Sequence, residues 1–156
     1  MIVTRRGALL GGAALALASP RASAAEPVHI AVTKGTGCEC CDGWAKHLRA
    51  NAYTVSVTET DDLEAVKVKL GIPDDLRTCH TGQMGDYLLE GHVPAAAIAY
   101  LLRAKPEGMI GLAVPGMPVG SPGMEVKGAK PDEYSVILFG PAGRSVLARY
   151  RGTTEL

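Results

Sequence analysis

The sequence predicts an α/β fold in which a central mixed sheet is flanked by helices and ends in a C-terminal β-hairpin. In the first half, short β-branched runs alternate with segments of helical composition, an order that favours parallel strands joined by right-handed crossovers. At the C-terminus, residues 134–139 and 145–150 flank Pro141-Ala142-Gly143, which is typical of an antiparallel hairpin. A sheet that combines both kinds of pairing is mixed.

Four segments of the first half account for the parallel part of this prediction. Strands are expected at residues 28–33 and 53–58, where Val, Ile and Thr are concentrated. Helices are expected at residues 38–50, with Trp44 in the core, and at residues 62–70. The order is therefore strand, helix, strand, helix.

The second half is expected to contain shorter elements and more loop. Residues 77–81 are assigned to a loop, residues 87–90 to a short strand, and a third helix is expected to begin at Pro94 and to reach Leu102. Residues 106–128 are dense in glycine and proline and predict a long loop. A loop of this length inside a compact domain is usually functional or disordered.

The first 24 residues have the parts of a secretory signal peptide. Two arginines at positions 5 and 6 precede an apolar stretch at residues 8–18, which is too short to span a bilayer of about 30 Å as a helix. The small-residue triplet Ala22-Ser23-Ala24 follows, so we expect cleavage after Ala24 and a single domain over residues 25–156. The arginine pair resembles a twin-arginine export signal, and the Sec and twin-arginine routes both remain open.

Composition limits the partners and the location of this domain. Removing residues 1–24 takes away three arginines and no acidic residue, which leaves 13 basic against 16 acidic residues and a net charge of −3. No basic patch favours nucleic acid binding. The sequence after the signal peptide has no apolar segment that predicts a membrane span, so we expect a periplasmic protein. With only 4% aromatic residues, the core is expected to consist of Val, Leu, Ile and Ala.

The chemistry-bearing residues are the four cysteines, which occur in a Cys-x-Cys-Cys motif at Cys38, Cys40 and Cys41 and in a Cys-His pair at Cys79 and His80. Cys38 and Cys41 are three residues apart and fall on one face of the first helical turn, where they can share a metal or a disulfide. Cys40 points about 100° further around the helix, so it fits poorly into a mononuclear tetrahedral site and would more easily bridge a second metal. Polynuclear thiolate sites suit Cu(I); zinc is the less favoured metal.

Two other readings of the same cysteines remain open. Cys38-x-x-Cys41 at the start of a helix that follows a strand matches the thioredoxin plan, which predicts a thiol-disulfide oxidoreductase. Four cysteines in an oxidising compartment could instead form two disulfides that staple a binding module. Metal binding is favoured over simple exchange because an exchange pair has no evident use for Cys40, Cys79 and His80.

Further candidate ligands lie outside the cysteine motifs. His80 offers an imidazole beside Cys79, and Met117 and Met124 in the glycine- and proline-rich loop offer thioethers, which are soft ligands matched to Cu(I). His47 lies two helical turns after Cys40. His92 either caps the third helix or is a ligand.

Several linked motifs occur along the chain: Gly37-Cys38-Glu39-Cys40-Cys41 with Trp44 and His47-Leu48, Leu70-Gly71-Ile72-Pro73, Cys79-His80-Thr81, Glu90-Gly91-His92-Val93-Pro94-Ala95 and Gly111 to Glu125. Together they resemble the family DUF411, exported bacterial metal-binding proteins of the CopG copper-resistance type, over nearly the whole predicted mature chain. The resemblance implies a thioredoxin-like fold, a periplasmic location, copper binding through the Cys-x-Cys-Cys and Cys-His motifs, and a part in copper tolerance. Partners implied are the metal ion and a periplasmic redox or copper-handling protein. By motif match the ligands are Cys38, Cys40, Cys41, Cys79 and His80.

Overall fold

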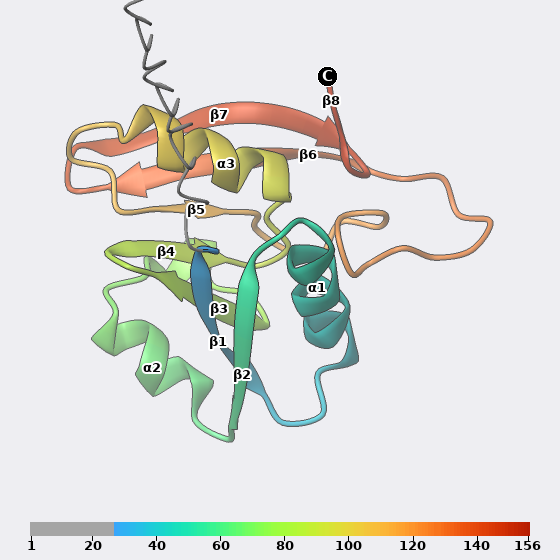
Figure 1. The fold of residues 1–156 in the computed structure, drawn as a ribbon, viewed down its shortest axis with the longest axis horizontal. Helices are drawn as coiled ribbons and strands as arrows, with labels where there is room; N and C mark the ends of the chain where they lie inside the picture. Colours follow the sequence, from blue (N-terminus) through green and yellow to red (C-terminus); the bar gives the residue numbers. More distant parts are fainter. Residues whose placement is uncertain (1–26) are drawn as a thin grey trace, which may run out of the picture.

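The structure is a computed structural model that describes residues 27–156, so the predicted signal peptide and its cleavage site lie outside the described residues. Strands and helices alternate at first and strands dominate later (Figure 1). The elements are β1 (His29–Gly35), α1 (Glu39–Ala50), β2 (Thr54–Thr60), α2 (Leu63–Lys69), the 3-10 turn η1 (Asp74–Leu76), β3 (His80–Met84), β4 (Tyr87–Glu90), α3 (Ala95–Ala104), β5 (Gly111–Ala113), β6 (Glu133–Gly140), β7 (Gly143–Arg151) and β8 (Thr154–Glu155).

The strands form one eight-stranded sheet in the order β2-β1-β3-β4-β5-β6-β7-β8. The pairs β1–β2 and β4–β5 are parallel and the other neighbours are antiparallel. Figure 1 shows β1 and β2 running across the direction of β6 and β7, since strand twist accumulates over a wide sheet. The predicted mixed sheet, with its parallel first pair and its C-terminal hairpin, is confirmed; the thioredoxin-like assignment of the whole fold stays a prediction.

The two sides of β3 face different helices. Gly82 leaves room for the Trp44 ring of α1, because a Cβ built on Gly82 would lie 3.0 Å from Trp44 Cη2. Thr81 faces α2, where Lys67 Nζ donates to Thr81 Oγ1 at 2.8 Å. Successive side chains of a strand alternate between faces, so His80 shares the α1 side with Gly82.

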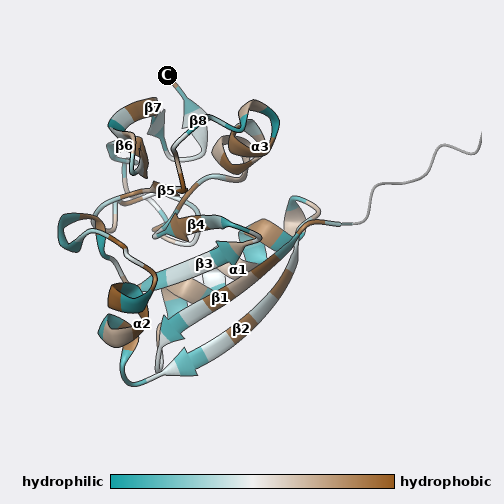
Figure 2. Ribbon diagram, turned by 90° about the vertical axis from the view of Figure 1, so that its left-hand side faces the viewer, coloured by the Kyte–Doolittle hydropathy of each residue, from teal (hydrophilic) through white to brown (hydrophobic). Residues whose placement is uncertain are grey.

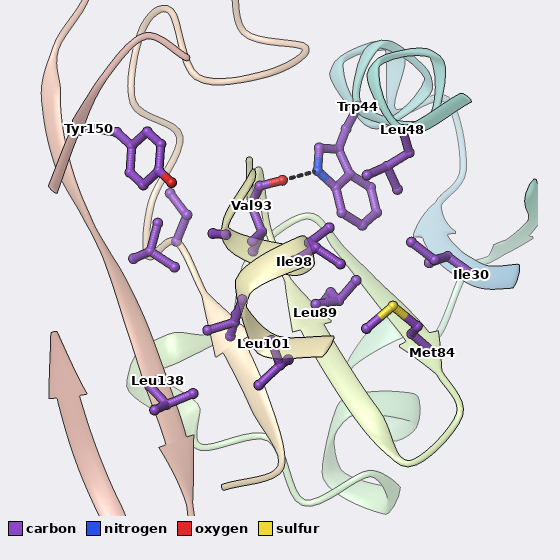
Figure 3. Packing of buried hydrophobic residues seen from close by; sticks show 14 of the residues in the cluster. Ile30, Trp44, Leu48, Met84, Leu89, Val93, Ile98, Leu101, Leu138 and Tyr150 are labelled. Atoms are coloured by element: carbon purple, nitrogen blue, oxygen red, sulfur yellow. Dashed lines mark hydrogen bonds between the residues drawn. The ribbon is translucent and has the colours of Figure 1, made fainter. Parts of the chain in front are cut away.

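The main core lies where α1 and α3 meet the sheet (Figure 3). The buried residues of α1 recur at helical spacing: Cys41, Trp44, Ala45 and Leu48. Trp44 is fully buried, and its indole N–H donates to the carbonyl of Val93 at 2.9 Å, which ties α1 to the start of α3. The predicted core position of Trp44 is confirmed.

The outermost long strand is only half covered. Along β2, Val55 and Val57 are partly buried while the alternate Thr54, Ser56 and Thr58 are exposed, and Figure 2 shows the corresponding alternation of apolar and polar residues. This pattern is that of a strand with one face on the protein and one in water. None of the helices within residues 27–156 is both long and apolar enough to cross a bilayer.

Two sequence-based expectations need correction. Residues 77–81 were expected to be loop, but β3 begins at His80, because pairing with β1 on one side and β4 on the other stabilises a segment of low β-propensity. The predicted loop 106–128 contains β5. A Cβ on Gly111 would lie 2.8 Å from Phe139 Cζ, so this glycine marks close strand packing and not a turn.

Candidate metal centre

The Cys-x-Cys-Cys motif lies at the junction between β1 and α1. Gly37, with φ of +73°, adopts a backbone conformation that favours glycine and turns the chain into the helix. Cys38 is the N-cap residue in an extended conformation, and α1 starts at Glu39. Cys38 and Cys41 form a disulfide with Cα atoms 5.4 Å apart. Cys38 and Cys41 therefore share a disulfide, which is one of the two arrangements that their spacing predicts, although Cys38 precedes the helix.

Cys40 and Cys79 are the two free cysteines of the described residues, and both are partly buried. Cys40 Sγ lies 3.6 Å from Cys38 Sγ and 4.0 Å from Cys79 Sγ. All four sulfurs lie within 4.8 Å of one another. Helical phase alone places Cys40 away from its neighbours, but Cys38 is an N-cap residue whose extended backbone does not follow that phase, so the sulfurs stay together.

A buried lysine holds this cysteine turn against the sheet. Lys34, at the end of β1, is 4% exposed, and its Nζ donates to the Cys38 carbonyl at 3.2 Å. The same ammonium group pairs with Asp42 at 2.7 Å and with Glu59 of β2 at 3.0 Å. The first turn of α1 is thereby fixed to the ends of both parallel strands.

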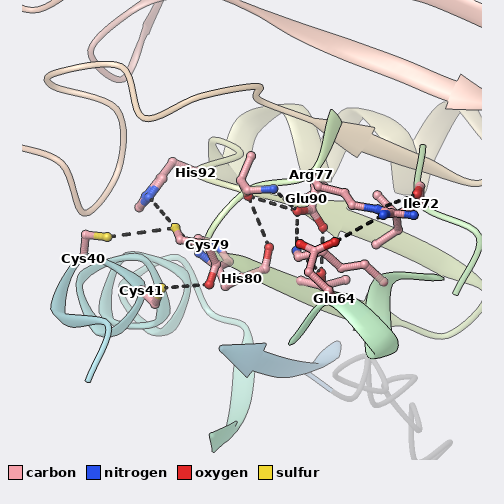
Figure 4. Close-up of polar contacts among 12 residues, drawn as sticks. Cys40, Cys41, Glu64, Ile72, Arg77, Cys79, His80, Glu90 and His92 are labelled. Carbon is pink, nitrogen blue, oxygen red and sulfur yellow. Dashed lines mark hydrogen bonds and ion pairs between the residues drawn. The ribbon is translucent and has the colours of Figure 1, made fainter. Parts of the chain in front are cut away.

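Two histidines face Cys79 from the other side. His80 Nδ1 lies 3.3 Å and His92 Nε2 3.5 Å from Cys79 Sγ (Figure 4). His92 Nδ1 is 2.8 Å from the carbonyl of Pro122. Because a carbonyl only accepts, Nδ1 carries the proton and the lone pair of His92 Nε2 points toward Cys79.

His80 has a buried ring nitrogen without a hydrogen-bond partner. Its ring is fully buried, and the centroid distances are 4.4 Å to the Trp44 ring and 4.9 Å to the His92 ring. Among the described residues, His80 Nε2 is the buried side-chain nitrogen or oxygen atom that has no partner. A buried nitrogen without a partner is unusual and requires an explanation such as a bound water or ion, whereas the nitrogen that faces Cys79 is Nδ1. Sequence reasoning included His80 among the ligands.

The site carries little charge of its own in this state. Burial, together with the neighbouring Cys40, raises the pKa of the Cys79 thiol to about 12. Burial lowers the pKa of His80 well below its usual value and also lowers the pKa of His92. Near neutral pH both imidazoles are therefore uncharged and Cys79 is a thiol, so a metal that binds Cys79 must displace its proton.

The glycine- and proline-rich loop closes one side of the centre. Gly123, with φ of +88°, packs on α1 so tightly that a Cβ would lie 2.5 Å from Trp44 N and 2.6 Å from the Cys40 carbonyl. Gly43 of α1 meets it from the other side, since its own Cβ would lie 2.8 Å from Gly123 Cα. This backbone contact brings Pro122 to His92.

The remaining candidate ligands take other positions. His47 Nε2 accepts the backbone N–H of Ala95 at 3.2 Å, so His47, and not His92, caps the third helix. Met124 is partly buried in the loop, where its N–H donates to the Ser121 carbonyl at 2.8 Å. Met117 is 55% exposed, and its role as a ligand stays a prediction.

His92 is the site residue that sequence reasoning left undecided, and one signal could have found it. The β3–β4 hairpin pairs Thr81 with Glu90 and Gly82 with Leu89. Extending this register by two residues places Cys79 opposite His92. Recognising the hairpin from its Gly85-Asp86 turn would have predicted the contact.

The geometry suits soft-metal chemistry once the Cys38–Cys41 disulfide is reduced. Two thiolates bound at about 2.3 Å to one tetrahedral metal lie about 3.8 Å apart. The Cys38–Cys40 and Cys40–Cys79 separations of 3.6 and 4.0 Å bracket that value. Cys79 belongs both to the four-sulfur group and to a second group with His80 and His92, so it lies between two sets of donor atoms.

Comparison with known proteins finds one family model and two similar solved structures. Residues 76–124 match the family model described as "Protein of unknown function, DUF411", a segment that includes Cys79, His80 and His92. The fold is similar to a solved structure named "Copper resistance protein copG- Form 1", with 46% identity, 81% of this chain and 100% of that chain covered, and a TM-score of 0.75. "Copper resistance protein copG- Form 2" gives 46% identity, coverage of 80% and 99%, and the same TM-score of 0.75. No curated protein matches the chain significantly.

Proposed function

The chain belongs to the CopG-type copper-resistance family, DUF411, and from this premise we propose that it is an exported copper-binding protein that serves in copper tolerance. The observation that carries the proposal is the meeting of four sulfurs within 4.8 Å, with two uncharged histidines beside the fourth. Thiolate sulfur and imidazole nitrogen form the donor set that Cu(I) prefers among biological metals, although zinc accepts the same atoms.

The proposed ligands are the four cysteines with His80, and we add His92 because its Nε2 lies 3.5 Å from Cys79 Sγ. Cys79, shared between the two donor groups, would bridge metals, and Cys40 between Cys38 and Cys79 would do the same. Met117 is an outer candidate, because its thioether is exposed and the sulfurs and imidazoles already provide enough donors. Replacement of Met117 by Leu separates the two cases: an unchanged copper count leaves it outside the site.

Copper loading of the complete set requires a reductant. The Cys38–Cys41 disulfide takes up two electrons and two protons to give two thiols, and these thiols then lose protons as they bind Cu(I). The bound metal would serve either storage or exchange between Cu(I) and Cu(II). Both uses are compatible with a partly exposed thiolate rim at Cys38 and Cys40.

An anaerobic titration of the reduced mature protein with Cu(I), with bound metal counted by native mass spectrometry, tests the proposal. Cys79→Ser and Cys40→Ser are expected to lower the copper count, whereas His29→Ala, an exposed histidine of β1, is a control that should not. Two or more coppers per chain support bridging, and a single copper argues against it. Absence of tight copper binding, or binding unaffected by Cys38→Ser and Cys41→Ser, would refute the proposal.

A thiol-disulfide oxidoreductase is the second candidate, favoured by one observation. Cys38 and Cys41 form a disulfide at the start of α1, with Cys38 partly exposed, as an exchange pair requires. Insulin reduction by metal-free protein, lost in Cys38→Ser, would support it. A binding module stapled by two disulfides is less well supported, because Cys40 and Cys79 are free. Counting the thiols of unreduced protein distinguishes the oxidoreductase, which keeps two free thiols, from the module with two disulfides, which keeps none.

The proposed location is the periplasm, reached by cleavage of the signal peptide after Ala24. N-terminal sequencing of the exported protein is expected to begin at Ala25. Comparing export in strains with and without the twin-arginine translocase decides between the Sec and twin-arginine routes. A redox or copper-handling protein of the same compartment is the proposed partner.

A further inference from the structure

A buried ion pair lies on the face of the sheet opposite the sulfur cluster. Lys67 of α2 and Glu90 of β4 are both fully buried, and Lys67 Nζ is 2.5 Å from Glu90 Oε1. The side-chain hydrogen bonds of Lys67 and Glu90 go to each other and to Thr78 and Thr81, and not to a cysteine or histidine of the centre. The proposed metal binding gives this pair no direct part.

The Glu90 carboxylate is surrounded by donors from two threonines. Thr78 donates its backbone N–H to Oε1 at 2.6 Å and its hydroxyl to the same oxygen at 3.1 Å. Thr81 donates its hydroxyl to Oε2 at 2.6 Å and accepts a hydrogen bond from Lys67 Nζ at 2.8 Å. Figure 4 shows Glu90 beside Cys79 and His80, on the side away from Cys40.

Thr78 and Thr81 are the residues immediately before and after Cys79-His80. Glu90 therefore fixes both ends of the dipeptide that offers a thiol and an imidazole to the metal. The register of the β3–β4 hairpin places Thr81 directly opposite Glu90. Because strand side chains alternate, holding Thr81 toward α2 turns His80 toward Trp44 and the cluster.

Close packing at Gly91 restricts the conformation of the segment between Glu90 and His92. Gly91 follows Glu90 with φ of +72°, and a Cβ there would lie 2.9 Å from Thr78 Oγ1 and 2.7 Å from the Val114 carbonyl. The N–H of Gly91 donates to the His80 carbonyl at 3.3 Å. The turn that leads from Glu90 to His92 is thus packed against the residue before Cys79.

A buried ion pair is a poor device for stability alone. Removing two charges from water is costly, and well-packed apolar residues of similar volume often serve the fold equally well. What an apolar pair cannot do is accept three hydrogen bonds from Thr78 and Thr81. The physical contribution of Glu90 is therefore orientation, and Lys67 neutralises the carboxylate that provides it.

We propose that Lys67 and Glu90 are a positioning pair of the metal centre, which holds Cys79 and His80 where they meet Cys40 and His92. The inference rests on the proposed copper binding. Ligand-orienting groups of this kind typically change metal affinity by about 10- to 100-fold when they are removed. We expect Cu(I) loss to a competing chelator to be faster by about that factor when the pair no longer holds the threonines.

The experiment compares four mature proteins: wild type, Glu90→Leu, Lys67→Met, and the double variant Lys67→Met/Glu90→Leu, because a glutamine at position 90 would keep an acceptor oxygen for Thr78. The double variant leaves no unpaired buried charge, so it separates orientation from the cost of an isolated ion. Glu64→Gln is the matched control, because Glu64 also lies on α2 and pairs with Arg77, but at an exposed position. Chelator competition and Cu(I) luminescence are measured on the folded fraction of each protein.

A folded double variant that loses Cu(I) about tenfold faster, with Glu64→Gln unchanged, supports the inference. A folded double variant with the copper retention and luminescence of the wild type overturns it. A second readout uses the metal-free reduced protein: alkylation of Cys79, relative to Cys40, is expected to accelerate in the double variant. Equal ratios in the two proteins also count against the positioning role.

Thr81→Val tests the same idea without touching either charge, and it covers the case in which the charge variants do not fold. It removes the hydroxyl that joins Thr81 to both partners, whereas Thr81→Ser retains it. Faster copper loss in Thr81→Val that is rescued in Thr81→Ser is expected; no difference contradicts the inference. A wild type that binds no copper would instead refute the proposed function, with the alkylation ratio still testing the positioning.

Discussion

Cys79 and His92 face each other across the end of the β3–β4 hairpin, with the sulfur 3.5 Å from the unprotonated ring nitrogen. Two strands that are adjacent in sequence provide this contact, and α1 adds the sulfurs of Cys38, Cys40 and Cys41 from the other side. The centre therefore depends on three segments: the cysteine turn, the start of β3 and the residues after β4. A loop closes it through the bond between His92 and Pro122.

Replacing His92 by Ala is expected to weaken Cu(I) binding about tenfold, the loss typical of one removed donor or orienting group at a metal site. The ring nitrogen nearest Cys79 disappears, while the cysteines remain. Chelator competition on the reduced protein measures the change. His29→Ala removes an exposed histidine of β1 and should leave retention unaltered. Equal retention in His92→Ala and wild type would exclude His92 from the site.

Copper capacity is expected to depend on the Cys38–Cys41 disulfide. Unreduced metal-free protein should show two reactive thiols under denaturing conditions, from Cys40 and Cys79, and four after reduction. Without reductant only half of the sulfurs can act as thiolates, so the bound copper should fall. Native mass spectrometry before and after reduction measures both. Full copper loading with the disulfide intact would contradict the proposed ligand set.

The sequence predicts the part of this centre that local spacing determines. A strand, a turn and a helix in succession place Cys38 and Cys41 together, and the structure has them bonded. The parallel β1–β2 pair and the C-terminal hairpin follow from hydrophobic periodicity in the same way. These features need no information about distant residues.

The contacts that local spacing does not determine come from β3 and β5. Gly82 and Gly111 lie in strands through pairing with their neighbours, and a tryptophan and a phenylalanine ring lie where their side chains would be, which composition alone does not reveal. Without β3, the chain gives no register, and without register Cys79 has no visible relation to His92 or Thr81 to Glu90. Tertiary pairing, not propensity, builds this half of the centre.

Acid is expected to destabilise the metal-free protein, because the pKa of His47 is lowered, as are those of His80 and His92. Burial lowers the pKa of His47, partly opposed by Glu125, so the unfolded chain binds a proton more readily than the folded one. The stabilisation is complete above the unfolded pKa of about 6.5 and is lost as the pH falls below it. Urea unfolding at several pH values from 8 to about 5 measures the loss.

His47→Ala isolates this contribution. The variant loses the acceptor for the Ala95 N–H and should be less stable by about 1 kcal/mol at pH 8, as for other lost helix caps. Its stability should fall less between pH 8 and 5 than that of the wild type, because one titrating group is gone. An unchanged pH slope would mean that His47 does not carry the dependence.

The backbone contact between Gly123 and α1 is expected to be necessary for a closed centre. Gly123→Ala adds a methyl group against Trp44 N and the Cys40 carbonyl, both backbone atoms that cannot yield easily. Gly116→Ala is the matched control: Gly116 lies in the same loop with a similar φ of +75°, but a Cβ there has nothing within 4 Å. Both variants lose roughly 1 kcal/mol of stability from a left-handed alanine, so any excess loss of unfolding free energy in Gly123→Ala measures the clash.

The lifted loop should also release His92 from Pro122 and speed Cu(I) loss to a chelator, an effect that Gly116→Ala should not share. Equal behaviour of the two variants would show that the loop does not need this contact to close over the metal.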